Sequence, residues 1–287
     1  MRFRAIKIDL RPTLALALLA AALICAPLLI RGRASAAMTG GVAVPVLMYH
    51  SVLDGEGRVG DYAVTAETFR ADMLWLKENG YTSVFVSELV DFVMRGVPLP
   101  PRPVVITLDD GYLNNLLYAL PVLEELDMKA VISVIGRYSV EFSETPDRSP
   151  SYAHLTWDDI TALAQSGLIE IGYHTYDLHE LSPRHGCMKK SGESTEEYRT
   201  ALSEDISRLQ ALLVEKCGVE PAIFAYPYGR VSKEALPVLK SLGFRAALTC
   251  ESRVNYLTGE PDELFQLGRF NRPSGISTET FMKRLSE

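Results

Sequence analysis

From about residue 42 onward the chain alternates short apolar runs with longer amphipathic ones, and this alternation is the strongest constraint on its fold. The apolar runs, which are typical of strands, cover residues 44–49, 81–86, 104–108, 130–135, 169–173, 223–225, 245–248 and 264–267. Helical spacing of apolar residues marks residues 69–79, 87–94, 113–126, 156–165, 195–216 and 232–242, and another helix starts at 278. Such alternation predicts an α/β fold with a mostly parallel sheet. With about seven or eight strands in roughly 240 residues, a distorted (β/α)7–8 barrel is favoured over an open doubly wound sheet.

Two of the predicted helices carry end signals. Thr156 is an N-cap candidate because Asp159 follows three residues later. The longest helix, residues 195–216, is followed by Gly218, a residue typical of helix C-termini. Residues 137–155 and 182–195 are polar and predicted to be irregular, so His154 and His185 within them are interpreted as loop residues.

The first 36 residues differ in composition from the rest and are predicted to be a targeting segment. Residues 1–33 hold six Lys and Arg against one Asp, around an uncharged apolar stretch at 13–30. That stretch is longer than a signal-peptide core of about 7–15 residues and borders on a spanning helix of about 17–25. A cleaved signal peptide and a membrane anchor therefore both stay open. Either one predicts that the second domain, residues 42–287, lies outside the cell membrane, anchored to it or secreted.

The charge balance and the cysteine spacing bear on which partners and which disulfides this chain can have. The formal net charge is −7, and the basic head makes the remainder more acidic still. This balance excludes nucleic acid as the main partner, because a phosphate-binding surface needs a basic excess. After the apolar stretch, Cys187, Cys217 and Cys250 show no CxxC spacing. One disulfide and three free thiols both stay open.

Polar residues follow four of the predicted strands. In a barrel of this kind the chemistry lies at the C-terminal ends of the strands, so we expect these residues to meet on one face. They are Tyr49-His50, Asp109-Asp110-Gly111, His174-Thr175 and Tyr226-Pro227-Tyr228-Gly229.

Two aspartates and two histidines among these residues indicate a metal site. Asp109 and Asp110 are adjacent, so the pleat sends their side chains in different directions. One can ligate a metal ion while the other stays free as a base, although Asp-Asp-Gly is also an ordinary turn sequence. His174 and His179 lie five positions apart in a loop and can curl around one ion. With one carboxylate they form a His2Asp set that leaves coordination positions open for water and substrate.

Three motifs, taken in order, resemble the polysaccharide deacetylase family, also called the NodB-homology or carbohydrate esterase 4 family. They are TLDDG (107–111), HTYDLH (174–179) and AYPYG (225–229), with VLMYHSV (46–52) upstream. The longer His spacing and the MYH opening are most similar to the poly-β-1,6-N-acetylglucosamine deacetylases. For residues 42–287 the resemblance implies a distorted (β/α)7-type barrel and a divalent metal ion. Zinc is the first expectation, with nickel, cobalt or iron as alternatives.

The resemblance also implies roles for individual residues. Asp109 is expected to be the general base, and Asp110, His174 and His179 are expected to hold the metal. The backbone N–H of Tyr228 is expected to stabilise the oxyanion. The substrate implied is a polymer of N-acetylated amino sugar, from which acetate is released.

Two departures from the family pattern lead to further hypotheses. The family commonly has an Arg, paired with the catalytic Asp, where this chain has Ala225, so Arg269 in LGRFNRP (267–273) is the candidate for the missing charge. The late His that serves the family as general acid is also absent. His50 is therefore the candidate for protonating the leaving amine or orienting substrate, with a hydrogen bond at the barrel rim as the alternative. Tyr226 and Tyr228 are expected either to wall the sugar site or to pack at the strand end.

The implied function is metal-dependent N-deacetylation of exopolysaccharide or peptidoglycan at the cell surface. The membrane is expected to be a partner only through the N-terminal segment. One alternative is a catalytically inactive carbohydrate-binding relative, against which the intact Asp and His set argues. The other is a deacetylase of small acetylated compounds, which an open groove would disfavour.

Overall fold

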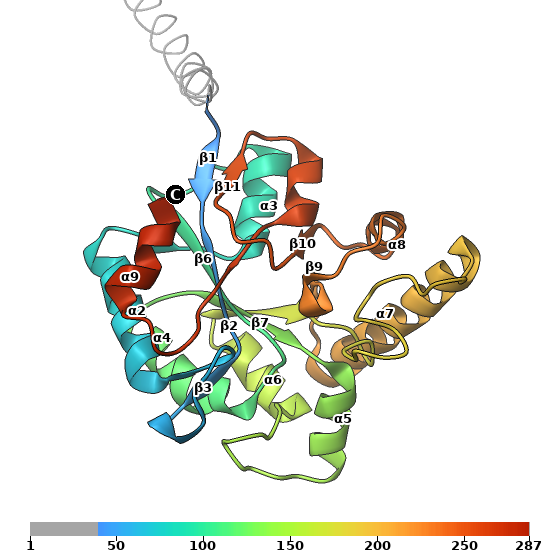
Figure 1. Cartoon of the computed structure of the whole chain (residues 1–287), viewed down its shortest axis with the longest axis horizontal. Coiled ribbons are helices and arrows are strands. Elements are labelled where there is room, and N and C mark those ends of the chain that lie inside the picture. The colour runs from blue at the N-terminus through green and yellow to red at the C-terminus, as the bar shows by residue number, and fades with distance from the viewer. Residues whose placement is uncertain (1–39, 287) are drawn as a thin grey trace, which may run out of the picture. The chain divides into compact units, whose positions relative to one another are not determined.

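A curved sheet of parallel strands occupies the centre of residues 40–286, the range that the computed structural model describes (Figure 1). Its strands follow the order β10-β9-β8-β7-β6-β2-β12, and β5 (Thr82–Ser83) pairs with β6 beside this order. The strands in the order are β2 (Val46–Tyr49), β6 (Pro103–Leu108), β7 (Ala130–Val134), β8 (Ile169–Tyr173), β9 (Ile223–Ala225), β10 (Ala246–Leu248) and β12 (Phe270–Asn271). All their pairings are parallel, so the predicted α/β class with a parallel sheet is confirmed.

The two ends of this strand order are joined only weakly. A single parallel bridge links Leu248 in β10 to Leu267, just ahead of β12. The amide of Thr249 donates to the carbonyl of Leu267 at 2.8 Å. The sheet is therefore a half-barrel with one bridge across its opening, where the sequence predicted a (β/α)7–8 barrel.

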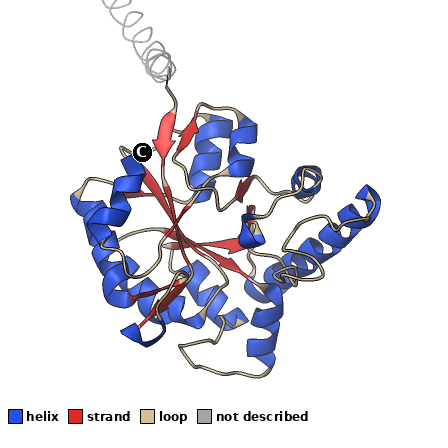
Figure 2. Cartoon of the chain, viewed as in Figure 1, coloured by secondary structure: helices blue, strands red, loops and turns tan. Residues whose placement is uncertain are grey.

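Helices surround the sheet (Figure 2). They are α2 (Ala66–Glu78), α3 (Val86–Arg95), α4 (Leu120–Leu126), α5 (Gly136–Glu144), α6 (Trp157–Gln165), α7 (Thr195–Cys217), α8 (Ala235–Ser241) and α9 (Thr278–Met282), with short helical turns at Glu56–Arg58, Asn115–Ala119, Pro227–Gly229, Pro261–Gln266 and Lys283–Ser286. Outside the main sheet, β1 (Val42–Val44) pairs antiparallel with β11 (Asn255–Leu257), and β3 (Ser51–Leu53) pairs parallel with β4 (Ala63–Thr65). None of the helices in residues 40–286 has both the length and the apolar content to cross a membrane. The predicted targeting segment, residues 1–36, lies outside the described residues.

Helix end signals in the sequence are confirmed. Thr156 caps α6 in a reciprocal capping box with Asp159, in which each side chain accepts from the other residue's backbone N–H. Ser194 and Glu197 form the same motif at the start of α7. This helix ends at Gly218, whose φ of 65° is left-handed and suits glycine.

Three predicted elements differ in the structure. Residues 264–266 lie in a 3-10 helix, Pro261–Gln266, and Leu267 makes only the single bridge to Leu248, because a short apolar run has no periodicity that separates a strand from a buried helical turn. The predicted irregular stretch 137–155 begins with α5, in which Gly136 lies against Tyr176 and Leu209 too closely for a side chain. Because α5 is held by packing against residues distant in the chain, its own sequence shows no apolar stripe from which a helix could be predicted. The predicted helix 113–126 contains a π-helical turn, Asn115–Ala119, near its start.

The centre of the sheet is mostly apolar, with Thr107 in β6 and Ser133 in β7 as buried polar residues, and further polar residues follow at its strand ends. All six residues of β6 are buried, as are all those of β2, β7, β9 and β10. Burial of both faces is the usual state of a parallel sheet covered by helices. The polar groups that follow β2, β6 and β8 therefore emerge at one end of the sheet. The three described cysteines, Cys187, Cys217 and Cys250, are free thiols.

Candidate metal and catalytic site

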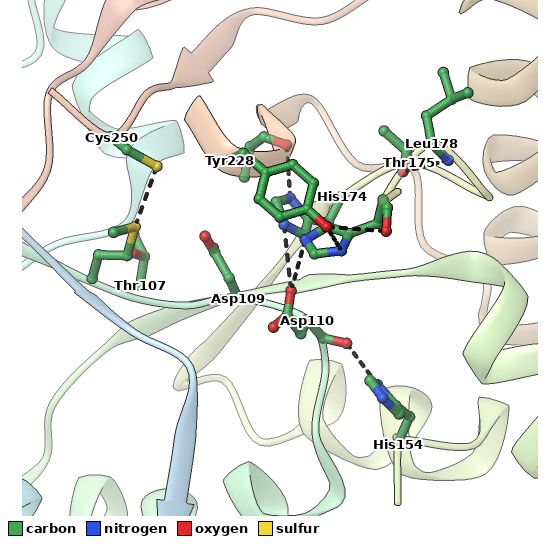
Figure 3. A network of polar contacts seen from close by, with 12 residues as sticks. Thr107, Asp109, Asp110, His154, His174, Thr175, Leu178, Tyr228 and Cys250 are labelled. Atoms are coloured by element: carbon green, nitrogen blue, oxygen red, sulfur yellow. Dashed lines mark hydrogen bonds and ion pairs between the residues drawn. The ribbon is translucent and has the colours of Figure 1, made fainter. Parts of the chain in front are cut away.

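Asp110, His174 and His179 form the one cluster of metal-competent side chains found in residues 40–286. Their ligand atoms all lie within 4.8 Å of one another. The Nε2 atoms of His174 and His179 are 3.5 Å and 3.4 Å from Oδ1 of Asp110 (Figure 3). The three residues that the sequence predicted as a ligand set are thus brought together from the ends of β6 and β8.

The chain turns sharply after β6, and this turn aims the two aspartates. Asp110 and Gly111 have φ angles of 70° and 67°, both in the left-handed region. A Cβ on Gly111 would lie 3.0 Å from a methyl of Val134, so this turn requires glycine. The left-handed conformation is unfavourable for Asp110 and needs support from its surroundings.

His154 supports the Asp110 turn. Its Nδ1 lies 2.9 Å from the carbonyl oxygen of Asp110, which can only accept a hydrogen bond (Figure 3). The His154 ring is stacked between Tyr112 and Tyr138, with ring centroids 4.6 Å and 4.2 Å away. His154 lies in the loop between α5 and α6, as the sequence interpretation of it as a loop residue has it, and segment 153–155 of this loop pairs with the chain just after Asp110.

Hydrogen bonds also fix the orientation of the metal-competent histidines. Nδ1 of His174 lies 2.8 Å from the carbonyl of Ala225 and must donate to it, which leaves the Nε2 lone pair facing Asp110. On His179, Nδ1 lies 3.3 Å from the hydroxyl of Tyr228, and its Nε2 faces the same carboxylate. Ring nitrogens held in this way are typical of metal ligands.

The charge state of the cluster fits a bound cation. Oδ1 of Asp110 is buried and has no hydrogen-bond partner in the described part of the chain. Burial, reinforced by the charge of Asp109, raises the pKa of Asp110 to about 7. Burial lowers the pKa of His174 to about 3, so its imidazole is neutral. A neutral imidazole pair with an uncompensated carboxylate suits zinc and several similar divalent ions.

Asp109 is held by Arg269. Nη1 of Arg269 donates to Oδ1 of Asp109 at 2.8 Å, Nη2 lies 2.8 Å from Oδ2 in the same ion pair, and both side chains are buried. Arg269 is itself oriented by the carbonyl of Thr249 and the hydroxyl of Thr107. Burial alone would raise the pKa of Asp109, but Arg269 outweighs it and holds that pKa well below its usual range. The contact that the sequence hypothesis required, Arg269 in place of an Arg at Ala225, is present.

A cleft of about 540 Å³ opens over these groups. Its walls include Asp109, both metal-competent histidines, Tyr228 and His50. The ring of His50 meets that of Tyr62 edge to face at 4.9 Å. Burial lowers the pKa of His50 to about 4, and its Nδ1 has no partner among the described residues, so no rim hydrogen bond occupies that atom.

Comparison with known proteins now decides the family. The profile described as "Polysaccharide deacetylase" matches residues 96–247, which is more than half of the chain. The chain belongs to the polysaccharide deacetylase family.

Relatives of this chain include enzymes named for one polymer. The poly-beta-1,6-N-acetyl-D-glucosamine N-deacetylase of Escherichia coli (strain K12) is 28% identical over 227 residues. The alignment covers 72% of this chain and 34% of that protein, so the chain spans about a third of the relative's length.

Two solved structures share the fold at similar identity. The de-N-acetylase from Aggregatibacter actinomycetemcomitans is 25% identical, with a TM-score of 0.72, and the match covers 85% of this chain and 100% of that one. IcaB from Ammonifex degensii is 26% identical, with a TM-score of 0.69, and the match covers 86% and 97%. The resemblance to this branch of the family is confirmed.

The two tyrosines of the third deacetylase motif separate in the structure. Tyr228 lines the cleft with a left-handed φ of 57°. Tyr226 is 1% exposed, lies outside the cleft and packs its ring edge-on against Phe224. Of the two expectations for Tyr226, the structure shows packing at the strand end and not a wall of the sugar site, because its backbone continues the pairing with Leu248 and its side chain enters the core.

Sequence reasoning missed part of the cleft. Its further lining residues are Met48, Tyr62, Tyr112, His185, Arg230, Cys250 and Asn271. Two of them carried a signal, since Tyr112 adjoins the Asp-Asp-Gly motif and Arg230 adjoins the AYPYG motif. His185 comes from the predicted insertion and contacts the ring of Tyr228, because Gly186 packs directly against the Pro227 carbonyl.

Proposed function

We propose that this polysaccharide deacetylase removes N-acetyl groups from a polymer containing N-acetylglucosamine, by metal-dependent hydrolysis outside the cell membrane. The observation that carries the proposal is the Asp110–His174–His179 cluster beside the Arg269-paired Asp109. The names of the similar enzymes support an amino-sugar polymer as substrate. The basic and apolar first 36 residues support export, by a cleaved signal or an anchor.

The residues of the cleft can divide the hydrolysis between them. Asp110, His174 and His179 would hold a divalent metal, for which zinc is the first choice; when bound, it lowers the pKa of a water molecule and polarises the acetamide carbonyl. Asp109, kept ionised and oriented by Arg269, accepts a proton from the attacking water. The water oxygen bonds to the carbonyl carbon, the C–N bond breaks, and acetate and a protonated sugar amine are the products.

His50 and Tyr228 serve the later part of the same reaction. His50 lies in the cleft wall and is neutral in the free chain; once negative charge has built up beside it, it takes up the proton that Asp109 received from the water and passes it to the leaving nitrogen, returning to the neutral form. The backbone N–H of Tyr228, on a left-handed turn at the cleft, donates to the developing oxyanion.

The shape of the cleft favours a polymer over a small acetylated compound. The cleft shares Tyr62 and Tyr112 with a neighbouring hollow of about 340 Å³. It shares Arg230 with another hollow of about 290 Å³. A site that continues on two sides accommodates sugars on both sides of the reacting one.

Acetate release from defined β-1,6 and β-1,4 N-acetylglucosamine oligomers tests the proposal. We expect release that stops after exhaustive chelation and returns when zinc is added. Activity that survives full chelation would overturn the metal-dependent mechanism. Zinc binding without acetate release from any oligomer would favour the alternative of an inactive carbohydrate-binding relative.

A further inference from the structure

The loop that joins the two metal-competent histidines begins with a strained residue. Thr175, directly after His174, has a φ of 72°. A β-branched residue rarely adopts this left-handed backbone, which persists only where the surroundings hold it. Two amides at the start of α5 contribute, because Gly136 and Arg137 donate to the carbonyls of Thr175 and Tyr176 at 3.0 Å and 2.9 Å.

Asp205, in α7, holds the same loop from another element. Its Oδ1 accepts from the amide of Tyr176 at 2.8 Å, and its Oδ2 accepts from the amide of Asp177 at 2.7 Å. One carboxylate thus fixes two consecutive peptide groups in a segment that starts at His174 and ends at His179. Asp205 is anchored in turn, since its backbone carbonyl accepts from the hydroxyl of Tyr173 at 3.0 Å.

A contribution to fold stability does not by itself explain why an aspartate occupies position 205. In residues 40–286 the donors to its side chain are two backbone N–H groups, whereas Asp109 has an arginine. Burial raises the pKa of Asp205 to about 6 in spite of those donors, so its charge opposes folding at neutral pH. The nearby Arg208 lies over the ring of Tyr176, 3.8 Å from its centroid.

We propose that Asp205 is a positioning residue that presets the metal-binding geometry of His174 and His179. This role rests on the proposed function only in that the chain binds a divalent metal. By holding the amides of Tyr176 and Asp177, Asp205 keeps the left-handed turn at Thr175 and therefore the spacing of the two imidazoles. Residues that orient metal ligands in this way typically contribute 10–100-fold to metal affinity.

The test compares Asp205→Asn with Glu204→Gln, a matched loss of one negative charge at the next, exposed position of the same helix. Zinc alone is added to the metal-free chain, and its Kd is measured by competition with a coloured chelator. We expect Asp205→Asn to raise the Kd about 10–100-fold and Glu204→Gln to leave it unchanged. The urea midpoint of metal-free Asp205→Asn should be no lower than that of the wild type. An unchanged Kd, or a Kd increase with a matching loss of metal-free stability, would overturn the proposal.

A second background keeps the test decisive if the single variant folds poorly. Thr175→Gly removes the strain of the left-handed turn, because glycine adopts that backbone freely. In this background Asp205→Asn should cost less zinc affinity than in the wild-type background, and equal losses in both would count against positioning. Acetate release is measured on the same preparations. Wild-type zinc binding without acetate release would contradict the proposed function and leave the role of Asp205 intact. Acetate release together with a zinc Kd that does not change in Asp205→Asn would support the proposed function and contradict the role of Asp205.

Discussion

Arg269 and Arg272 lie three residues apart, and each forms a buried ion pair with an aspartate from a distant part of the chain. Arg269 pairs with Asp109 at 2.8 Å and Arg272 pairs with Asp72 at 2.7 Å. All four side chains are almost fully buried. The chemistry of the two pairs is the same, yet only Asp109 lines the cleft.

The difference lies in what else each carboxylate binds. Asp72 also accepts from the hydroxyls of Tyr49 and Thr278, at 2.9 Å and 2.6 Å, so its lone pairs are used within the fold. The side chain of Asp109 accepts from Arg269 and faces the cleft with its remaining capacity. A buried ion pair whose carboxylate accepts hydrogen bonds from several parts of the fold joins those parts together. A buried ion pair whose carboxylate keeps free lone pairs at a cleft is available for chemistry. We therefore expect opposite outcomes when each pair is changed.

The largest expected effect is on catalysis by Asp109→Asn. Removing the base should lower kcat for acetate release by about 10²–10⁴-fold, because proton transfer by a positioned side chain contributes about that much. Asp72→Asn is the matched control, and its kcat per folded molecule should equal that of the wild type. Similar kcat losses in the two variants would break the distinction between the pairs.

Arg272→Ala should give the largest loss of stability without a change in chemistry. It leaves Asp72 as an uncompensated buried charge, which typically costs about 3–5 kcal/mol. Urea unfolding should show this loss, while kcat of the folded fraction and its zinc affinity stay at wild-type values. Arg269→Ala should lower both stability and kcat. A kcat and a pH profile unchanged by Arg269→Ala would remove its proposed link to the base.

His50→Gln tests the same distinction between catalysis and stability at another residue of the cleft wall. If His50 protonates the leaving amine, its loss should lower kcat by about 10²-fold or more, the lower end for acid–base catalysis. The zinc Kd and the urea midpoint should stay near wild type, because Nδ1 of His50 has no hydrogen-bond partner to lose in the described residues. Undiminished turnover would eliminate the acid role.

The smallest expected effect is on the pH dependence of stability and concerns Asp205. Backbone amides bind this carboxylate, whereas arginines bind those of Asp109 and Asp72. Its folded-state pKa is raised from 3.8 to about 6 by burial and by the charge of Asp177, against the lowering effect of its two amide donors and of Arg208. Between these values the folded metal-free chain binds more protons than the unfolded chain. The contribution of Asp205 to the free energy of unfolding therefore falls as pH rises from about 4 to about 6.

Urea titrations of Asp205→Asn and Glu204→Gln across this range check the sign. The slope of unfolding free energy against pH should become less negative in Asp205→Asn and stay unchanged in Glu204→Gln. A slope that turns more negative in Asp205→Asn would contradict the raised pKa.

Local patterns in the sequence were enough to predict most of the elements. Strand-like runs and cap residues such as Thr156 act within a few positions, so they can be recognised without the partner elements. The rule that parallel strands present their carboxyl ends on one side predicted that the Asp109-Asp110 pair and His174 meet. The resemblance to the deacetylase family implied that Asp110 is the ligand, together with His174 and His179. The π-helical turn at Asn115–Ala119 and helix α5 could not be predicted in this way, because packing against distant residues stabilises them.

The sequence by itself determined the α/β class, the residues available for chemistry and their order along the chain, because these depend on periodicity and on short motifs. Only the tertiary structure decided which arginine meets Asp109, that Tyr226 turns into the core, and that Asp205 holds the histidine loop. Each of these depends on segments far apart in the chain coming together. Arg269 pairs with a residue 160 positions away, and the sequence hypothesis could name it but not place it. Contacts between residues so far apart in the chain depend on how the whole half-barrel packs, and they cannot be predicted from a short stretch of sequence.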